Sequence, residues 1–371
     1  MSNKDQSNAL LTNALVADAR QPRGGSSRAA ANGLSLRPLA EDLETWQKLL
    51  SACPNATLYH SKRWIELLSR SHRFTMWLAT LARQGRPVAG CVFARAHNPF
   101  VRRLISLPFS DGCAMAVLEP EASTELLDAL VARGPIGTSY EVRGVDCGAP
   151  WDTVRYFANW RLELDRPVES IERGLKVNFR RNLRQAARQS MRIEHGSSGQ
   201  HLKRFYALQL ETRRRFGLPA QPMRFFKLTR EIFAPSGDFD IWIANDGGKD
   251  VAAAVFLREN DVVYFKWSAR RSDCRSSANH LLVWSAIEEF APRTRALDLG
   301  RADSRNQGLT RFKRELGATA TPLPHAFYPT ARHQVSAEVL TGAHKTAARV
   351  WSMLPLFVTR PLGWAIYRFL A

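Results

Sequence analysis

The residues best suited to chemistry in this chain form a charged group behind a short apolar strand. Residues 296–299 (Ala-Leu-Asp-Leu) are expected to be a buried strand, followed by a glycine turn at Gly300 and by Arg301. A basic helix then carries Lys313. These two cations, next to Asp298 on the strand, could bind an anionic ligand. The alternative is that the charges are only solvated.

A second group of candidates lies on the strand and loop that precede this block. Tyr264 and Trp267 fall on an expected central strand over residues 262–268, where a buried aromatic is most often part of the core. The next loop contains Arg271 and leads into a helix whose first turn contains Asn279. Free N–H groups and the helix dipole at such a helix start favour a pyrophosphate.

A basic helix is predicted over residues 178–190, with Asn178 as its N-cap. Arg181 and Arg184 lie on one stripe of this helix, and residues 173–215 hold twelve Lys/Arg and two Glu. Such a face suits the phosphates of a sugar nucleotide, a lipid pyrophosphate or tRNA, whereas the alternative is a solvated basic surface. Far from this region, Asp111 follows an apolar strand in the sequence LPFSDG, where an aspartate could act as a base or bind an amine.

The composition narrows the class of partner. The 371 residues include 53 Lys+Arg and 34 Asp+Glu, a formal net charge of +19. This surplus favours a polyanion: nucleic acid, an anionic membrane or a phosphorylated ligand. The five cysteines are scattered without a C-x-x-C pair, which argues against disulfides and against a metal site. With no apolar run long enough to span a membrane, we expect a cytoplasmic protein.

The elements that position these residues predict an α/β (α+β) chain with two modules. In each module, helices precede an antiparallel meander, and a helix, a strand and a further helix follow it. The predicted organisation has four parts: a disordered leader (1–33), an N-terminal domain (34–166), a C-terminal domain (167–330) and a basic amphipathic tail (331–371).

The tail allows two interpretations. It contains five basic residues and one acidic residue among many apolar ones. This pattern is typical of a peripheral contact with the inner face of a membrane. The alternative is a helix that packs back on the body of the protein.

Five segments together resemble a known family. They are the helix after TLYHSKRW, the LPFSDG turn, and the sequences NFRRNLRQAARQSMRIE, HLLVWSAIEEF and LDLGRADSRNQGLTRFKRELGATATPL. The chain is similar to the Fem-type branch of the GNAT-fold acyltransferases, relatives of the peptidoglycan-bridge aminoacyltransferases. The resemblance runs from about residue 34 to about residue 328 and implies two tandem GNAT-like domains, each with a mixed, largely antiparallel sheet flanked by helices.

The resemblance also implies an activity and a donor site. The pantetheine of the donor would lie at residues 264–268 and 297–299, where two parallel strands splay, and its pyrophosphate at 271–279. Arg301 and Lys313 would bind phosphates, and Asp298 and Asp111 would position or deprotonate the amine. The expected reaction moves an acyl group from a thioester, acyl-CoA, to an amino group of a cell-envelope or exopolysaccharide precursor that is phosphorylated or nucleotide-linked.

Two alternatives to this activity remain open. The segment Arg271-Ser272-Asp273-Cys274 lacks the glycines of the usual CoA signature, so the donor could instead be an aminoacyl-tRNA. A non-catalytic GNAT scaffold at the membrane is the other alternative.

Overall fold

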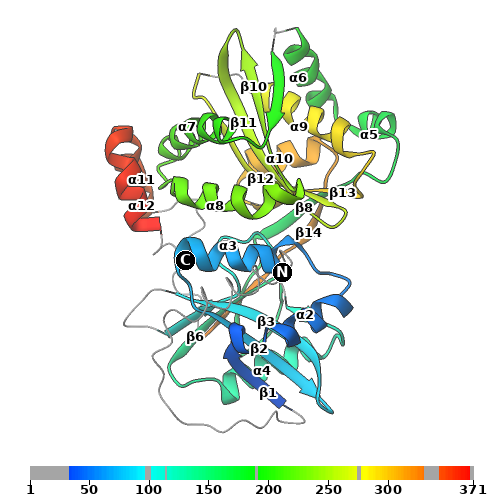
Figure 1. Ribbon diagram of the computed structural model, residues 1–371, viewed down its shortest axis with the longest axis vertical. Helices are drawn as coiled ribbons and strands as arrows, with labels where there is room; N and C mark the ends of the chain where they lie inside the picture. The colour runs from blue at the N-terminus through cyan, green and yellow to red at the C-terminus, as the bar shows by residue number, and fades with distance from the viewer. Residues whose placement is uncertain are drawn as a thin grey trace, which may run out of the picture. The chain divides into compact units, whose positions relative to one another are not determined.

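The computed structural model describes residues 33–96, 102–112, 115–188, 191–273, 277–329 and 342–367. These residues form two compact units. The predicted leader lies outside the described residues except for its last residue, and so does the first part of the predicted tail. Each unit contains one sheet flanked by helices (Figure 1), which confirms the predicted fold class.

The first unit contains a sheet of eight strands in the order β1-β2-β3-β4-β6-β15-β7, with β5 paired to β3. Helices α2 to α4 belong to the same unit. Its strands are β1 Gly33–Pro38, β2 Met76–Arg83, β3 Arg86–Arg95, β4 Arg102–Ile105, β5 Ala116–Val117, β6 Thr138–Arg143, β7 Asp152–Val154 and β15 His325–Tyr328. Its α-helices are α2 Leu43–Ala52, α3 Lys62–His72 and α4 Ala122–Arg133.

The second unit contains a sheet of seven strands in the order β14-β8-β13-β12-β11-β10-β9. Its strands are β8 Phe157–Glu163, β9 Arg192–Gly196, β10 Phe239–Asp246, β11 Lys249–Glu259, β12 Val262–Arg270, β13 Ala296–Asp303 and β14 Thr319–Pro322. Its α-helices are α5 Val168–Gly174, α6 Val177–Ala187, α7 Gly199–Arg215, α8 Met223–Phe233, α9 Ser277–Phe290, α10 Gln307–Glu315, α11 Gly342–Met353 and α12 Leu356–Tyr367. The predicted antiparallel meander is confirmed as β10-β11-β12.

Two strands pair in the sheet of the other unit from the one that the expected domain boundaries would assign to them. Strand β8 precedes the expected boundary at residues 166/167, yet it pairs with β13 and β14 in the second sheet. Strand β15 falls within the expected second domain, yet it lies between β6 and β7 of the first sheet. Long-range pairing therefore divides the chain near residues 155/156 and 322/323. Such pairing between distant segments cannot be predicted from the local composition of the chain.

The helices of the second unit cover the two faces of its sheet. Buried residues of α9 pack against Phe256 and its neighbours two positions apart on β11, as alternation along a strand requires. Helices α7 and α8 pack on the opposite face of β10–β12 (Figure 1). Within the described residues, no helix has the length and apolar character that crossing a membrane requires.

Helix α6 begins one residue earlier than predicted. Lys176 is its N-cap residue, and the expected cap, Asn178, lies inside the helix and donates a hydrogen bond from Nδ2 to Glu315 Oε1 at 3.0 Å. The buried residues Phe179 and Ala186 pack α6 against the core shared with α9. The N-cap predicted at Asn178 is therefore wrong, because a tertiary contact uses its amide group.

Candidate functional site

The central feature of the second unit is the divergence of two parallel strands. Strands β12 and β13 pair from Val262/Ala296 to Tyr264/Asp298. Within the described residues, their ladder ends at that pair, although β12 continues beside β11 to Arg270 and β13 continues beside β8 to Asp303. The segments 264–268 and 297–299, which we expected to form a donor site, therefore lie where the two strands separate.

A bulge on β12 occurs one residue after the strands separate. Phe265 pairs with Phe256 and Trp267 pairs with Val255, so Lys266 is an extra residue on β12. Without this bulge, Phe265 and Trp267 would share one face of the sheet. With it, Phe265 packs toward the α9 face and Trp267 packs edge-on against Phe225 and Phe226 of α8. Trp267 is thus held in an aromatic cluster on the other face.

A second irregularity bends β13. The register between β13 and β8 shifts between Asp298 and Arg301, and Gly300 has a φ of 72°, which a side chain would disfavour. Asp298 is buried and accepts hydrogen bonds from Gly300 N–H at 2.7 Å and from Asn159 Nδ2 at 2.8 Å. The expected turn at Gly300 is therefore a bulge inside a longer strand. Both carboxylate oxygens of Asp298 are therefore hydrogen bonded at this bulge. The sequence had predicted that Asp298 contacts an amine, and it had not predicted this structural role.

Lys313 of α10 supports the same bulge from the interior. Its side chain is 3% exposed, and Nζ donates to the backbone oxygens of Gly300 at 2.9 Å and Arg301 at 3.0 Å. This geometry gives Lys313 a structural task in place of the predicted phosphate contact. Arg301 is half-buried, with its guanidinium carbon 4.3 Å from the centre of the Phe157 ring. The structure therefore brings Tyr264, Asp298, Arg301 and Lys313 together.

The start of α9 lies beside the middle of α6. His280 of α9 hydrogen bonds through Nε2 to Asn182 Nδ2 at 3.1 Å and packs against Phe179. Asn279, in the same first turn of α9, is partly exposed. Residues 274–276 of the predicted pyrophosphate segment lie outside the described residues. The first turn of this helix offers backbone N–H groups to an anion.

The predicted arginines of α6 are exposed. Arg181 and Arg184 lie on the side of the helix opposite buried Phe179 and Ala186. They do not join the group around Asp298 and Lys313. Their positions are those of a basic surface on α6.

A buried polar cluster on α7, which the sequence reasoning missed, lies on the Trp267 face of the sheet. Gln209 donates from Nε2 to Gln221 Oε1 at 3.1 Å, and Tyr206 OH donates to Gln221 O at 3.1 Å. Burial raises the pKa of Tyr206, so its hydroxyl stays protonated at neutral pH. Thr212 bonds the backbone of Arg270 and so ties α7 to the end of β12. Polar residues on the buried side of a helix were the available sequence signal.

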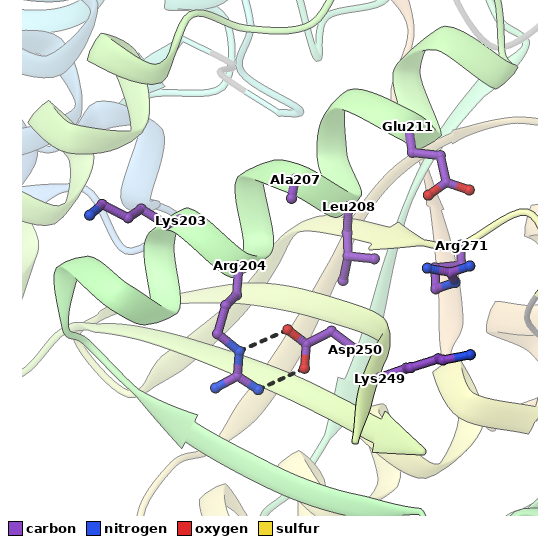
Figure 2. Close-up of a pocket in the computed structure, with 8 residues that line it drawn as sticks. All are labelled: Lys203, Arg204, Ala207, Leu208, Glu211, Lys249, Asp250 and Arg271. Carbon is purple, nitrogen blue, oxygen red and sulfur yellow. Dashed lines mark hydrogen bonds and ion pairs between the residues drawn. The ribbon is translucent and has the colours of Figure 1, made fainter. Parts of the chain in front are cut away.

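Arg271 lies in a pocket beside α7 (Figure 2). The pocket has a volume of about 440 Å³, and its lining includes the exposed residues Lys203 and Lys249. Arg271 forms a two-bond ion pair with Asp273, at 2.7 and 2.8 Å. The structure therefore places this predicted donor-binding residue on the α7 side, in a basic pocket.

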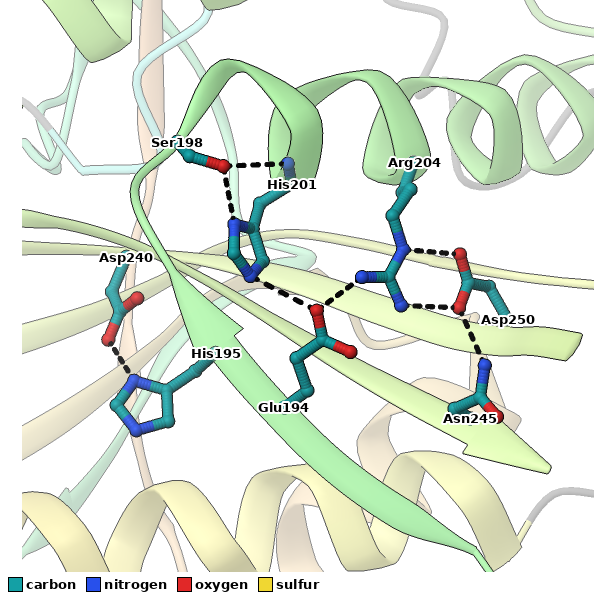
Figure 3. A network of polar contacts seen from close by, with 8 residues as sticks. All are labelled: Glu194, His195, Ser198, His201, Arg204, Asp240, Asn245 and Asp250. Carbon is teal, nitrogen blue, oxygen red and sulfur yellow. Dashed lines mark hydrogen bonds and ion pairs between the residues drawn. The ribbon is translucent and has the colours of Figure 1, made fainter. Parts of the chain in front are cut away.

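An ion-pair network fixes the first half of α7 to the sheet (Figure 3). Arg204 donates to both oxygens of Asp250 at 2.7 and 2.8 Å, and it also pairs with Glu194 of β9. Asn245 donates to Asp250 from the same hairpin. Hydrogen bonding to Arg204 is the main reason that the pKa values of Asp250 and Glu194 are lowered. The network attaches the N-terminal half of α7 to β9 and to the β10–β11 hairpin, and Thr212 attaches its C-terminal end to β12.

Asp111, the other predicted amine-positioning residue, belongs to the first unit. Its Oδ2 accepts a hydrogen bond from the hydroxyl of buried Tyr59 at 2.7 Å. The neighbouring Ser110 accepts from Trp64 Nε1 at 2.7 Å. These bonds hold the LPFSDG loop against α3. Across the described residues of both units, no three His, Cys, Asp or Glu side chains are grouped as a metal site would require.

Comparison with known families identifies the second unit. Residues 174–314 match the model of the family described as "Acetyltransferase (GNAT) domain". The match contains β12, β13 and α9, the elements that build the divergence. It confirms the predicted GNAT domain and the predicted class of enzyme, an acyltransferase. A search of curated protein sequences gave no match.

Solved structures with the same fold cover both units. FemX aligns with 78% of this chain and 96% of its own, at 13% identity and a TM-score of 0.58. The C-terminal domain of a putative lysylphosphatidylglycerol synthetase from Agrobacterium fabrum covers 84% and 95%, at 13% identity and 0.51. A tandem GNAT protein from the clavulanic acid biosynthesis pathway covers 79% and 98%, at 12% identity and 0.50. These likenesses confirm the tandem GNAT fold.

The variant Lys313→Met tests the structural role of the buried ammonium. It removes two charge-assisted hydrogen bonds and leaves the carbonyls of Gly300 and Arg301 without this donor, so the free energy of unfolding should fall by about 1.5–3 kcal/mol. Urea denaturation measures the change. The control Lys227→Met, at an exposed position of α8, should change it by less than about 0.5 kcal/mol. Equal effects of the two variants would contradict the assigned role.

The variant Asp250→Asn tests the network around Arg204 and its dependence on pH. Because the pKa of Asp250 is lowered from 3.8 on folding, its stabilisation is complete above that value and is lost as the pH falls below it. At neutral pH the free energy of unfolding of the variant should therefore be about 1 kcal/mol lower than that of wild type. This difference in stability should shrink as the pH falls toward about pH 3. Thermal unfolding at several pH values measures it. The control Asp246→Asn changes an exposed carboxylate of the same hairpin outside this network, and at neutral pH it should change the free energy of unfolding by less than about 0.5 kcal/mol.

Proposed function

Because this chain carries a GNAT acetyltransferase domain, we propose that it transfers an acyl group from acyl-CoA to an amino group. The observation that carries the proposal is the end of the β12/β13 ladder at Tyr264/Asp298. Beyond that pair, an extended chain such as pantetheine can lie along the strand edges and form backbone hydrogen bonds. The diphosphate of the donor would then meet the first turn of α9.

The reaction needs few groups from the protein. The nitrogen of a neutral amine attacks the thioester carbonyl, the C–N bond forms and the C–S bond breaks. The proton lost by the nitrogen leaves with the coenzyme A thiolate or passes to solvent. The carbonyl oxygen becomes negative in the transition state, and backbone N–H groups of β12 beyond Tyr264 would stabilise it. The structural bonds of Asp298 support a role in shaping this strand edge, and a role as base remains a prediction.

The acceptor would approach over the α7 face of β12. On that face the hydroxyl of Tyr206 and the amide of Gln209 bond to Gln221, and Tyr206 packs against Phe226, which in turn contacts Trp267. Such groups suit an acceptor with several hydroxyls or amides. We therefore propose an amine on a phosphorylated or nucleotide-linked glycan precursor of the cell envelope or of an exopolysaccharide. The exposed basic surfaces of the domain would favour its negative charge.

Binding of the donor is the most direct test. Titration calorimetry with acetyl-CoA and longer acyl-CoA thioesters should show saturable binding, and a saturating donor should raise the melting temperature. Aminoacyl-tRNA serves as the competing donor in parallel assays of transfer to amino sugars. Transfer that requires aminoacyl-tRNA and is abolished by ribonuclease, without acyl-CoA binding, would replace the CoA proposal with the tRNA-dependent one.

Deleting Lys266 tests whether the bulge on β12 shapes the donor site. The deletion leaves Phe265 opposite Phe256 and Trp267 opposite Val255, so both rings keep their faces and the protein should stay folded. The straightened strand should bind acetyl-CoA at least about tenfold more weakly, a loss of about 1.4 kcal/mol. The control Lys266→Ala keeps the extra residue and should retain most of the affinity. Unchanged affinity in a folded deletion variant would remove the bulge from the proposed site.

A further inference from the structure

An exposed apolar surface gathers at one place in the second unit. Of the seven large apolar side chains that are exposed among the described residues, four come from α11, α12 and the end of α7. In the following, this "tail surface" is the set Phe216 (56% exposed), Val350 (56%), Met353 (71%) and Leu362 (42%). Scattered single exposures are ordinary in proteins, whereas a concentration of this kind indicates a binding surface.

Close backbone contacts fix the helices that carry the tail surface. Gly217, directly after Phe216, has a φ of 66°, and an added Cβ there would lie 2.3 Å from the oxygen of Ala348 in α11. At Gly363 of α12, an added Cβ would lie 3.3 Å from the oxygen of Ala220. Helices α11 and α12 thus pack against α7 and the residues that follow it (Figure 1).

The outward side of α11 carries two large exposed apolar side chains. Ala348 faces α7, while Val350 and Met353 lie about 60° apart on the opposite side of the helix, from the 100° rotation per residue. Arg349 is exposed between them and the packed side. A helix that packs on a protein normally directs its apolar stripe inward, so an outward stripe is suited to a second apolar environment.

Charge around the tail surface indicates what covers it. Residues 339–371 contain four Lys/Arg and no Asp or Glu. Arg349 and Arg360 are exposed on the same two helices, α11 and α12, and the guanidinium of Arg215 lies 5.0 Å from the centre of the Phe216 ring. Apolar side chains with a rim of cations and no carboxylates complement a bilayer that contains anionic lipids.

We propose that the tail surface docks this protein on the surface of an anionic membrane. Val350, Met353, Leu362 and Phe216 would enter the headgroup region, and Arg349 and Arg360 would contact lipid phosphates. No helix among the described residues is suited to crossing a bilayer, so the contact is peripheral. The proposal is independent of the donor and of the reaction. It places the acyltransferase domain next to acceptors that are carried on lipids.

Vesicle sedimentation tests the proposal with the full chain. Wild type should sediment with vesicles of equal parts phosphatidylglycerol and phosphatidylcholine, less at high salt, and little with phosphatidylcholine alone. Met353→Glu and Val350→Glu should each lower the partition coefficient at least about tenfold. Both positions are exposed, so the melting temperature should not change. Arg349→Gln should weaken binding mainly at low salt.

A matched control distinguishes docking through the tail surface from nonspecific attraction between a basic protein and anionic vesicles. Val177 on α6 is 73% exposed, close to the 71% of Met353, and it also lies on a basic helix. Val177→Glu should therefore bind the vesicles like wild type. Equal weakening by Val177→Glu, or no binding by wild type, would overturn the proposal. So would a dimer that Met353→Glu converts to a monomer without vesicle binding, because the surface would then be an interface between two copies.

Discussion

The buried ammonium group of Lys313 supports the second sheet at the point where β12 and β13 diverge. Lys313 donates to two consecutive carbonyl oxygens of β13, those of Gly300 and Arg301, and Asp298 accepts a hydrogen bond from the N–H group of Gly300. A charge inside a protein is costly unless it is paired or hydrogen bonded, so these groups must stay together once the domain is folded. They impose a bend on β13 at the residue where it stops pairing with β12. An interior contact therefore supports the β13 bulge at the point where the two strands diverge.

Local patterns predicted the parts of this fold that local forces determine. The antiparallel meander expected in the second module is β10-β11-β12, whose strands follow one another in the sequence. The charged block was also identified, because a short apolar strand followed by cations is visible in one segment. The family resemblance supplied the meaning of the divergence. The resemblance also supplied its location, and the residue pattern alone gave only the two strands on which Tyr264 and Asp298 fall.

Other features depend on contacts that the sequence does not display. Trp267 faces α8 because Lys266 lies in a bulge and not at a regular paired position, where simple alternation would have put Trp267 on the same face as Phe265. Lys313 appeared to be a surface cation because its partners are backbone oxygens, which exist at every position. Asn159 contacts Asp298 across 139 residues of sequence. Each of these is a property of the packed sheet, so a single sequence without its pairing partners cannot reveal it.

The position of β15 imposes an order on how this chain is made. The strand lies inside the first sheet, between β6 and β7, but its residues follow the whole second unit in the sequence. On the ribosome, the first sheet must wait with β6 and β7 unjoined until His325–Tyr328 has been synthesised. Only two residues, Leu323 and Pro324, separate β15 from β14 of the second sheet. Synthesis of β14, the last strand of the second sheet, is thus followed directly by synthesis of β15, the last strand of the first sheet. A chain truncated after β14 would lack β15, and β6 of the first sheet would then have an unpaired edge.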